Sequence, residues 1–228
     1  MAEISGRHYL SGFDVALGSL RDHVLMMASL TQRNLDHARR GLFQREEELC
    51  NNAIADDEEI DALEIQMDRD GMALLMRFQP VASDLRVVIA TMKLSVNLER
   101  LSDLVVHIAR RARKLITKPA LAEIAELEPL FDHVTRMLDD AIKAFSTGNF
   151  LVVESLKERD AAIRTRSHTL AGRVTQRMSF ETGDGINAYL EIIFILRYLE
   201  QIGHLITNLG EDVLLAFSRE SPSPILGP

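Results

Sequence analysis

The sequence predicts an all-α fold of two tandem three-helix bundles, with six long antiparallel helices in all. Apolar residues recur at every third or fourth position along nearly the whole chain, which is the period of an amphipathic helix. No stretch shows the alternation of apolar and polar residues that is typical of a half-buried strand. The second half also repeats the first, so that Asp57 is matched by Asp160 at a shift of 103 and Glu99 by Glu200 at a shift of 101.

The first repeat is expected over residues 1–118 and the second over 119–218. Lys118 and Pro119 mark the boundary, because proline cannot continue a helix interior. The tail over 219–228 is rich in Ser and Pro and is expected to be disordered.

The composition of the chain excludes some classes of function and favours one cellular compartment. The chain of 228 residues has a formal charge of -8, which argues against nucleic-acid binding because that depends on Lys and Arg meeting phosphates. A single cysteine, Cys50, suits a reducing compartment. The N-terminal segment has no basic-then-apolar signal, and no uncharged apolar run approaches about 18 residues. We therefore expect a cytoplasmic protein.

Two helices are expected before the first proline of the chain. The first should cover about residues 8–42 and the second roughly 44–77, ending before Pro80. The apolar stripe of the first is Leu10, Phe13, Leu17, Leu20, Val24 and Met27, and that of the second is Ile60, Leu63, Met67 and Leu74.

A third, long helix should begin after Pro80, with Ser83 as its cap and Asp84 at its positive end. Its apolar residues follow spacings of four and three, which is typical of a helix facing a bundle core. They are Leu94, Leu98, Leu101, Val105, Ile108, Ala112 and Leu115. The matching residues of the second repeat are Ile195, Leu199, Ile202, Ile206, Leu209, Val213 and Ala216. Pro129 suits the first turn of the fourth helix, and a loop is expected over 181–185.

Carboxylates follow the same helical spacing in the first repeat. Four acids lie along one stripe of the second helix: Asp57, Asp61, Glu64 and Asp68. On the third helix, a second apolar stripe of Leu85, Ile89, Met92 and Val96 is expected to be dry and continues into Glu99 and Asp103. Like charges at these spacings repel each other, and oxygen ligands from two helices suit magnesium, manganese or ferric iron and, in part, zinc. The pattern predicts a metal site, and a merely solvated acidic face is the alternative.

The second repeat keeps only part of this pattern. Asp160 and Glu200 are retained, but Arg164 replaces Asp61 and His204 replaces Asp103. We expect Arg164 to pair with Asp160 or Glu200 and to supply the positive charge that a cation supplies in the first repeat. A second metal site of Asp160, Glu200 and His204 should then be weak.

Basic residues crowd the end of the third helix: Arg110, Arg111, Arg113, Lys114 and Lys118. Cations there complement the negative end of the helix. Alternatively, they contact acidic lipid headgroups or an acidic partner surface.

Residues 79–86 (QPVASDLR) together with 97–103 (NLERLSD) closely resemble the signature of the PhoU family of bacterial phosphate-signalling regulators. Residues 199–204 (LEQIGH) are similar but differ where the family usually has Arg and Asp. The resemblance implies tandem three-helix bundles that bind multinuclear metal clusters through Glu/Asp-x-x-x-Asp motifs. Asp57 with Asp61, and Glu99 with Asp103, match that motif here.

The resemblance further implies a negative regulator of the phosphate-starvation response that modulates phosphate uptake. Its partners would be the ATPase of the phosphate ABC transporter and a sensor histidine kinase. We expect a homodimer without catalytic residues, at the inner face of the membrane, holding iron, zinc, manganese or magnesium. Two alternatives stay open: a ferritin-like di-metal carboxylate enzyme and a structural helical adaptor. The enzyme would need Glu-x-x-His twice, and no histidine here has Glu three residues earlier.

Overall fold

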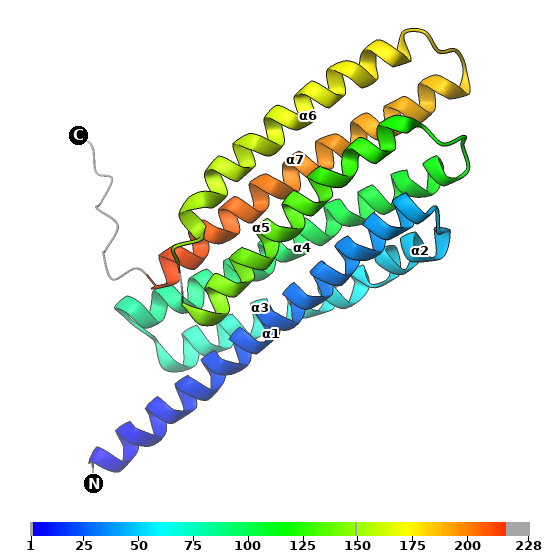
Figure 1. Ribbon diagram of the computed structural model, residues 1–228. Coiled ribbons are helices and arrows are strands. Elements are labelled where there is room, and N and C mark those ends of the chain that lie inside the picture. Colours follow the sequence, from blue (N-terminus) through cyan, green and yellow to red (C-terminus); the bar gives the residue numbers. More distant parts are fainter. Residues whose placement is uncertain (1, 149, 218–228) are drawn as a thin grey trace, which may run out of the picture.

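The computed structural model describes residues 2–148 and 150–217, with side chains from Gly12 onward, and this part of the chain is helical throughout its regular elements (Figure 1). The elements are α1 (Ala2–Gln44), α2 (Glu47–Ala55), α3 (Asp57–Phe78), α4 (Ala82–Ile116), η1 (Ala122–Leu127), α5 (Glu128–Thr147), η2 (Val153–Ser155), α6 (Leu156–Met178) and α7 (Asp184–Phe217). The predicted all-α class is confirmed. The expected tail over 219–228 lies outside the described residues.

The helices form one elongated bundle, and their axes run roughly along its length (Figure 1). Helices α1 to α4 pack together as one unit and α5 to α7 as the other, while α4 and α7 form the main contact between them. These two helices are antiparallel, since Lys118 of the α4 end lies 3.0 Å from Asp184 at the start of α7, and Lys93 lies 3.6 Å from Asp212 near its end. The α4/α7 pair is therefore the shared centre of the two repeats.

The predicted apolar stripes of α4 and α7 form the centre of the core. Every one of their residues is at most 4% exposed, from Leu94 to Leu115 and from Ile195 to Ala216. Burying a large apolar side chain stabilises a fold by about 1.5–3 kcal/mol, so these two stripes dominate the packing energy. On α1, Phe13, Leu20, Val24 and Met27 are buried as predicted.

The predicted second helix is interrupted, which the sequence pattern did not indicate. Asp56 separates α2 from α3, and its carboxylate accepts a hydrogen bond of 3.1 Å from Nε of Arg33 on α1. At the other end, Gln79 adopts a left-handed conformation (φ 46°, ψ 53°) and Pro80 prevents α3 from continuing, as expected. Ser83 does not cap α4, because the capping position is Val81 and no side chain bonds there.

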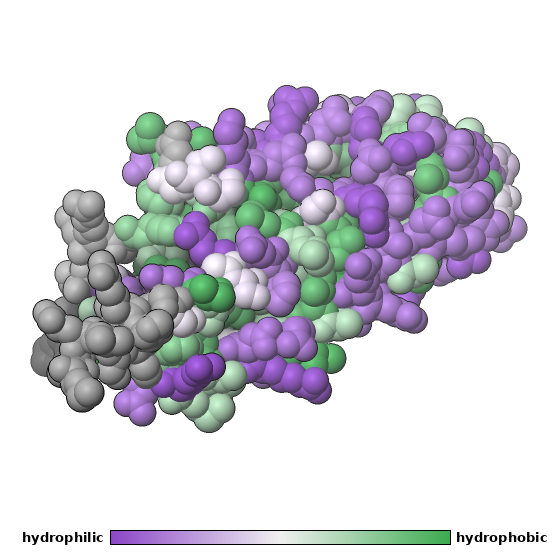
Figure 2. Space-filling view, turned by 90° about the horizontal axis from the view of Figure 1, so that it is seen from below, coloured by the Kyte–Doolittle hydropathy of each residue, from purple (hydrophilic) through white to green (hydrophobic). Residues whose placement is uncertain are grey.

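The second apolar stripe of α4 is not dry, so that prediction was wrong. Leu85, Ile89 and Val96 are 36–43% exposed because no helix covers them, whereas Met92 lies against Gly71 of α3. With Met76 of α3, Leu85 places apolar surface near the turn between α3 and α4. Figure 2 shows hydrophobic patches on the half of the molecule where α1 begins and a largely hydrophilic opposite half. None of the described helices is long and apolar enough to span a membrane.

Candidate metal centre

The acids of the first repeat lie where the start of α3 runs along the middle of α4. Asp57 is the first residue of α3, and its Oδ1 accepts a hydrogen bond of 2.6 Å from the Ser102 hydroxyl of α4. Glu99 lies one helical turn before Ser102, and Asp103 follows Ser102 directly. Because Glu99 and Asp103 are four residues apart, they share one face of α4, next to Ser102. The expected juxtaposition of the two acidic motifs is present in the fold.

The acids also interact electrostatically. Burial raises the pKa of Glu99 to about 7, and the negative charges of Asp103, Asp61, Glu64 and Asp57 add to the rise. Burial likewise raises the pKa of Asp57, with further contributions from Asp61 and Asp103, while the hydrogen bond from Ser102 and the charge of Arg110 oppose it. Because neighbouring negative charges add to the effect of burial on Glu99 and Asp57, a cation that screens them would be favoured here.

The side-chain arrangement is looser than a finished metal site. Among the described residues, no three His, Cys, Asp or Glu side chains stand in an arrangement that could hold a metal ion. The donors are hard oxygens that suit magnesium, manganese or ferric iron, so the chemistry of the side chains fits although their present arrangement does not hold an ion. Elsewhere on α3, Glu64 and Asp68 line a cavity of about 560 Å³ with Asp212 of α7.

A buried polar chain lies beneath Asp57, and sequence reasoning did not assign it a role. Nδ2 of Asn34 on α1 lies 3.4 Å from Oγ of Ser102 and donates to it, and Ser102 in turn donates to Asp57. Both Asn34 and Ser102 are fully buried. The signal in the sequence is a small polar residue directly after the core residue Leu101, although the pattern does not say which helix it faces.

In the second repeat, the acid equivalent to Asp57 is Asp160, and its neighbours differ. Asp160 is buried, and Nη2 of Arg164 lies 3.4 Å from its Oδ2 while Nδ1 of His204 lies 4.0 Å from the same atom. Glu200 is paired instead with Arg197 at 3.0 Å. Of the two partners expected for Arg164, the structure therefore has Asp160.

Asp103 and His204, which occupy equivalent places in the two repeats, line the same cavity of about 620 Å³. Arg100, Arg164, Arg197 and Glu200 also line it. The candidate sites of both repeats thus open onto one groove along the α4/α7 pair.

Two units, α1 to α4 and α5 to α7, joined along α4 and α7, define a tandem-bundle protein with charged residues along the groove between them. The comparisons give the family. The PhoU domain model matches residues 24–112 and again 127–213. The chain belongs to the PhoU family, and both of its repeats match.

Named relatives and solved structures agree with this assignment. Phosphate-specific transport system accessory protein PhoU homologs from Zymomonas mobilis and Pseudomonas putida are each 31% identical, over 92% and 91% of this chain and 88% and 81% of their own lengths. The crystal structure of PhoU from Pseudomonas aeruginosa has a TM-score of 0.86 at 28% identity, covering 90% of this chain and 98% of that one. A PhoU structure from Streptococcus pneumoniae, 24% identical with a TM-score of 0.78, covers 91% of this chain and 98% of that one and shows the same fold.

Proposed function

We propose that this protein is a metal-binding negative regulator of the phosphate-starvation response that acts by protein contacts. The observation that carries the proposal is the PhoU match over both repeats, together with relatives named as accessory proteins of the phosphate-specific transport system. No sequence motif for nucleotide hydrolysis accompanies it, because no glycine-rich run precedes a lysine as in a phosphate-cradling loop.

The partners proposed are the ATPase of the phosphate ABC transporter and the sensor histidine kinase, with two copies of the chain acting as a dimer. The chain would work in the cytoplasm, at the inner face of the membrane where both partners would be reached. By linking transporter to kinase, it would switch off kinase signalling and modulate uptake when phosphate is plentiful. The elongated bundle offers long helix faces to such partners (Figure 1).

The metal is proposed to act as a structural cation in the first repeat. Asp57, Asp61, Glu64, Glu99 and Asp103 would hold it, and the ion would offset the burial and the neighbouring negative charges that raise the pKa of Glu99. A bound ion would fix α3 against α4 and so fix the surface that partners contact. In the second repeat, Arg164 beside Asp160 supports the proposal that a protein cation takes this place, leaving at most a weak site at Asp160, Glu200 and His204.

The test of the regulatory role is a deletion of the gene in cells grown with ample phosphate. A reporter of the starvation regulon should be switched on in the deletion strain and repressed again by the wild-type chain supplied in trans. Repression that persists in the deletion strain would contradict the proposal. Complementation with the Glu99→Ala/Asp103→Ala variant, at matched protein level, then asks separately whether regulation needs the acids.

A further inference from the structure

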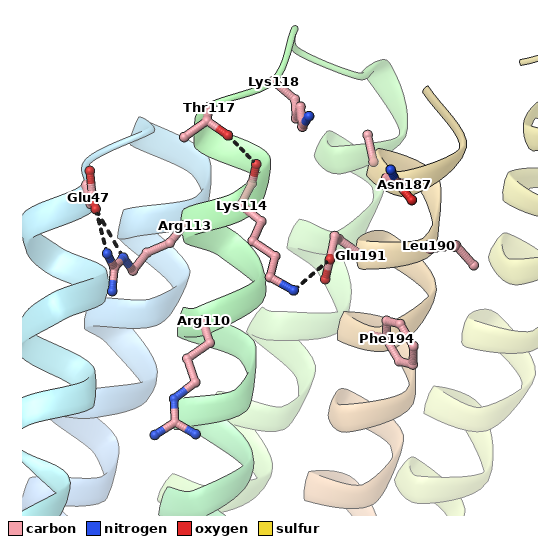
Figure 3. Close-up of a pocket in the computed structure, with 11 residues that line it drawn as sticks. Glu47, Arg110, Arg113, Lys114, Thr117, Lys118, Asn187, Leu190, Glu191 and Phe194 are labelled. Atoms are coloured by element: carbon pink, nitrogen blue, oxygen red, sulfur yellow. Dashed lines mark hydrogen bonds and ion pairs between the residues drawn. The ribbon is translucent and has the colours of Figure 1, made fainter. Parts of the chain in front are cut away.

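A third cavity along α4 and α7 lies at the opposite end of α4 from the exposed apolar stripe. It has a volume of about 670 Å³ and lies between the last turns of α4 and the first turns of α7, with Glu47 of α2 at its edge (Figure 3). None of the predicted metal-site residues lines it. The cavity is therefore lined by other residues than the candidate metal centre, although the charge of Arg110 reaches Asp57.

The residues that line this cavity carry a net positive charge, whereas the chain as a whole is negative. Its lining has four cations, Arg110, Arg113, Lys114 and Lys118, against the two acids Glu47 and Glu191. The formal balance is thus +2, while the whole chain carries -8. Such a local reversal of sign attracts an acidic ligand and orients it as it approaches.

The acids of the lining are already paired with cations. Glu191 is contacted by Arg111 at 3.0 Å and by Lys114 at 3.1 Å, and Glu47 accepts both hydrogen bonds that Arg113 donates (Figure 3 shows the second and third of these pairs). By contrast, Arg110 forms no hydrogen bond or ion pair within 4 Å with any described residue, although its charge acts on Asp57 at longer range. Figure 3 shows its guanidinium extending from α4. Its donors are available to a ligand carboxylate.

An apolar surface adjoins these cations. Phe194 is 41% and Leu190 36% exposed, both on α7 and both in the lining. The guanidinium carbon of Arg111 lies 4.3 Å from the centroid of the Phe194 ring, a cation–π contact. A partly exposed aromatic side chain in the same recess as the guanidinium of Arg110 is the composition of an anchor point in a protein interface.

The geometry points to this cavity as the docking site for an acidic segment of a partner protein, with an apolar side chain of the segment on Leu190 and Phe194 and a carboxylate toward Arg110. A membrane surface fits less well, because the apolar residues line a recess between two helices and an acidic chain is repelled by acidic lipids. The inference rests on the proposed function only in that the chain acts through protein contacts.

The test begins with selection of short random peptides displayed on phage against the immobilised full chain. We expect the selected peptides to be rich in Asp and Glu around a Leu, Phe or Tyr. Enrichment of basic or uncharged peptides, or no enrichment at all, would overturn the inference. Because the selection needs no cell and no metal, its failure would leave the regulatory role standing, and a failure of the gene deletion would leave the peptide result standing.

The best selected peptide is then labelled and its affinity measured by fluorescence anisotropy. The Arg110→Gln/Phe194→Ser variant should bind it about tenfold more weakly, and affinity for the wild-type chain should fall with added salt. The control variant Arg136→Gln/Phe180→Ser removes a cation and an aromatic ring that are 74% and 81% exposed outside the cavity, and should bind as the wild type does. Equal affinity of the first variant and the wild type would contradict the assignment. A second result would also contradict it: the wild type binding more tightly to vesicles of equal parts phosphatidylcholine and phosphatidylserine than to the peptide.

Discussion

The Ser102 hydroxyl donates a hydrogen bond of 2.6 Å to Oδ1 of Asp57, and the second repeat has no counterpart of this bond. Gly203 stands at the position of Ser102, and Oδ1 of Asp160 is buried without a hydrogen-bond partner. A Cβ placed on Gly203 would lie 3.3 Å from that oxygen, so the backbone geometry of the two repeats matches and only the side chain differs.

This difference explains how one fold treats the same acid in two ways. In the first repeat Asp57 is held by neutral polar groups and keeps acidic neighbours, while in the second Asp160 lies beside Arg164 and His204. The first arrangement leaves negative charge for an added cation, and the second already has a cation of its own.

Removal of the Ser102 hydroxyl should destabilise the fold. In a Ser102→Ala variant, Asp57 loses its donor and Asn34 its acceptor inside the core, and a hydrogen bond to a charged group is worth about 1.5–3 kcal/mol. Urea unfolding monitored by circular dichroism measures the change. Ser95→Ala is the matched control, because Ser95 is equally buried on α4 but bonds only to the carbonyl of Met92 in its own helix. Equal losses of stability in the two variants would contradict a special role for Ser102.

Stability should depend on pH through Glu99. Its pKa is 4.5 in the unfolded chain and about 7 in the folded one, so the folded state favours the neutral acid. Stability should therefore fall as the pH rises from about 4.5 to about 7 and stay at the lower level above that. After allowance for solvent screening of this partly exposed group, we expect a loss of about 1–2 kcal/mol.

The measurement is urea unfolding across this pH range with a chelator present. Glu99→Gln should remove most of the slope and make the chain more stable above pH 7, whereas Glu58→Gln, at an exposed position of α3, should leave the slope intact. A slope that persists unchanged in Glu99→Gln would show that other groups cause it.

Gly210 should not tolerate a methyl group. A Cβ there would lie 2.6 Å from Cδ1 of Leu156 and 2.9 Å from Cγ1 of Val153, so Gly210→Ala should cost about 1–3 kcal/mol through overpacking. Gly172 of α6 has nothing within 4 Å, and Gly172→Ala should stabilise the helix by about 0.5–1 kcal/mol. Thermal unfolding compares the two, and a stabilising Gly210→Ala would refute the close approach of η2 and α6 to α7.

Arg164→Asp should give the second repeat the carboxylate pair that the first one has. Without metal, the variant should be less stable, because two acids then face each other where Asp160 had a cation 3.4 Å away. With metal supplied during expression, we expect more metal per chain than in the wild type, measured on the purified protein. An unchanged metal content would count against the idea that Arg164 stands in for a cation.

Periodic burial could be predicted from the sequence, and contacts between helices could not. The stripes from Leu94 to Leu115 and from Ile195 to Ala216 are visible because a helix face repeats every three or four residues. The same spacing in Leu85, Ile89 and Val96 gave a wrong answer, since a period identifies a face but not whether another helix covers it. The hydrogen bonds of Asp56 with Arg33 and of Ser102 with Asn34 join residues 23 and 68 positions apart, which a helical period does not reveal.

Elemental analysis of the natively purified chain tests the central claim, that the first-repeat acids hold a metal ion. The wild type should contain iron, zinc, manganese or magnesium in a fixed ratio to protein. The Glu99→Ala/Asp103→Ala variant should lose most of it, and the equivalent Glu200→Ala/His204→Ala variant should keep it. A wild-type chain without bound metal, or a first variant with the full metal content, would contradict the claim.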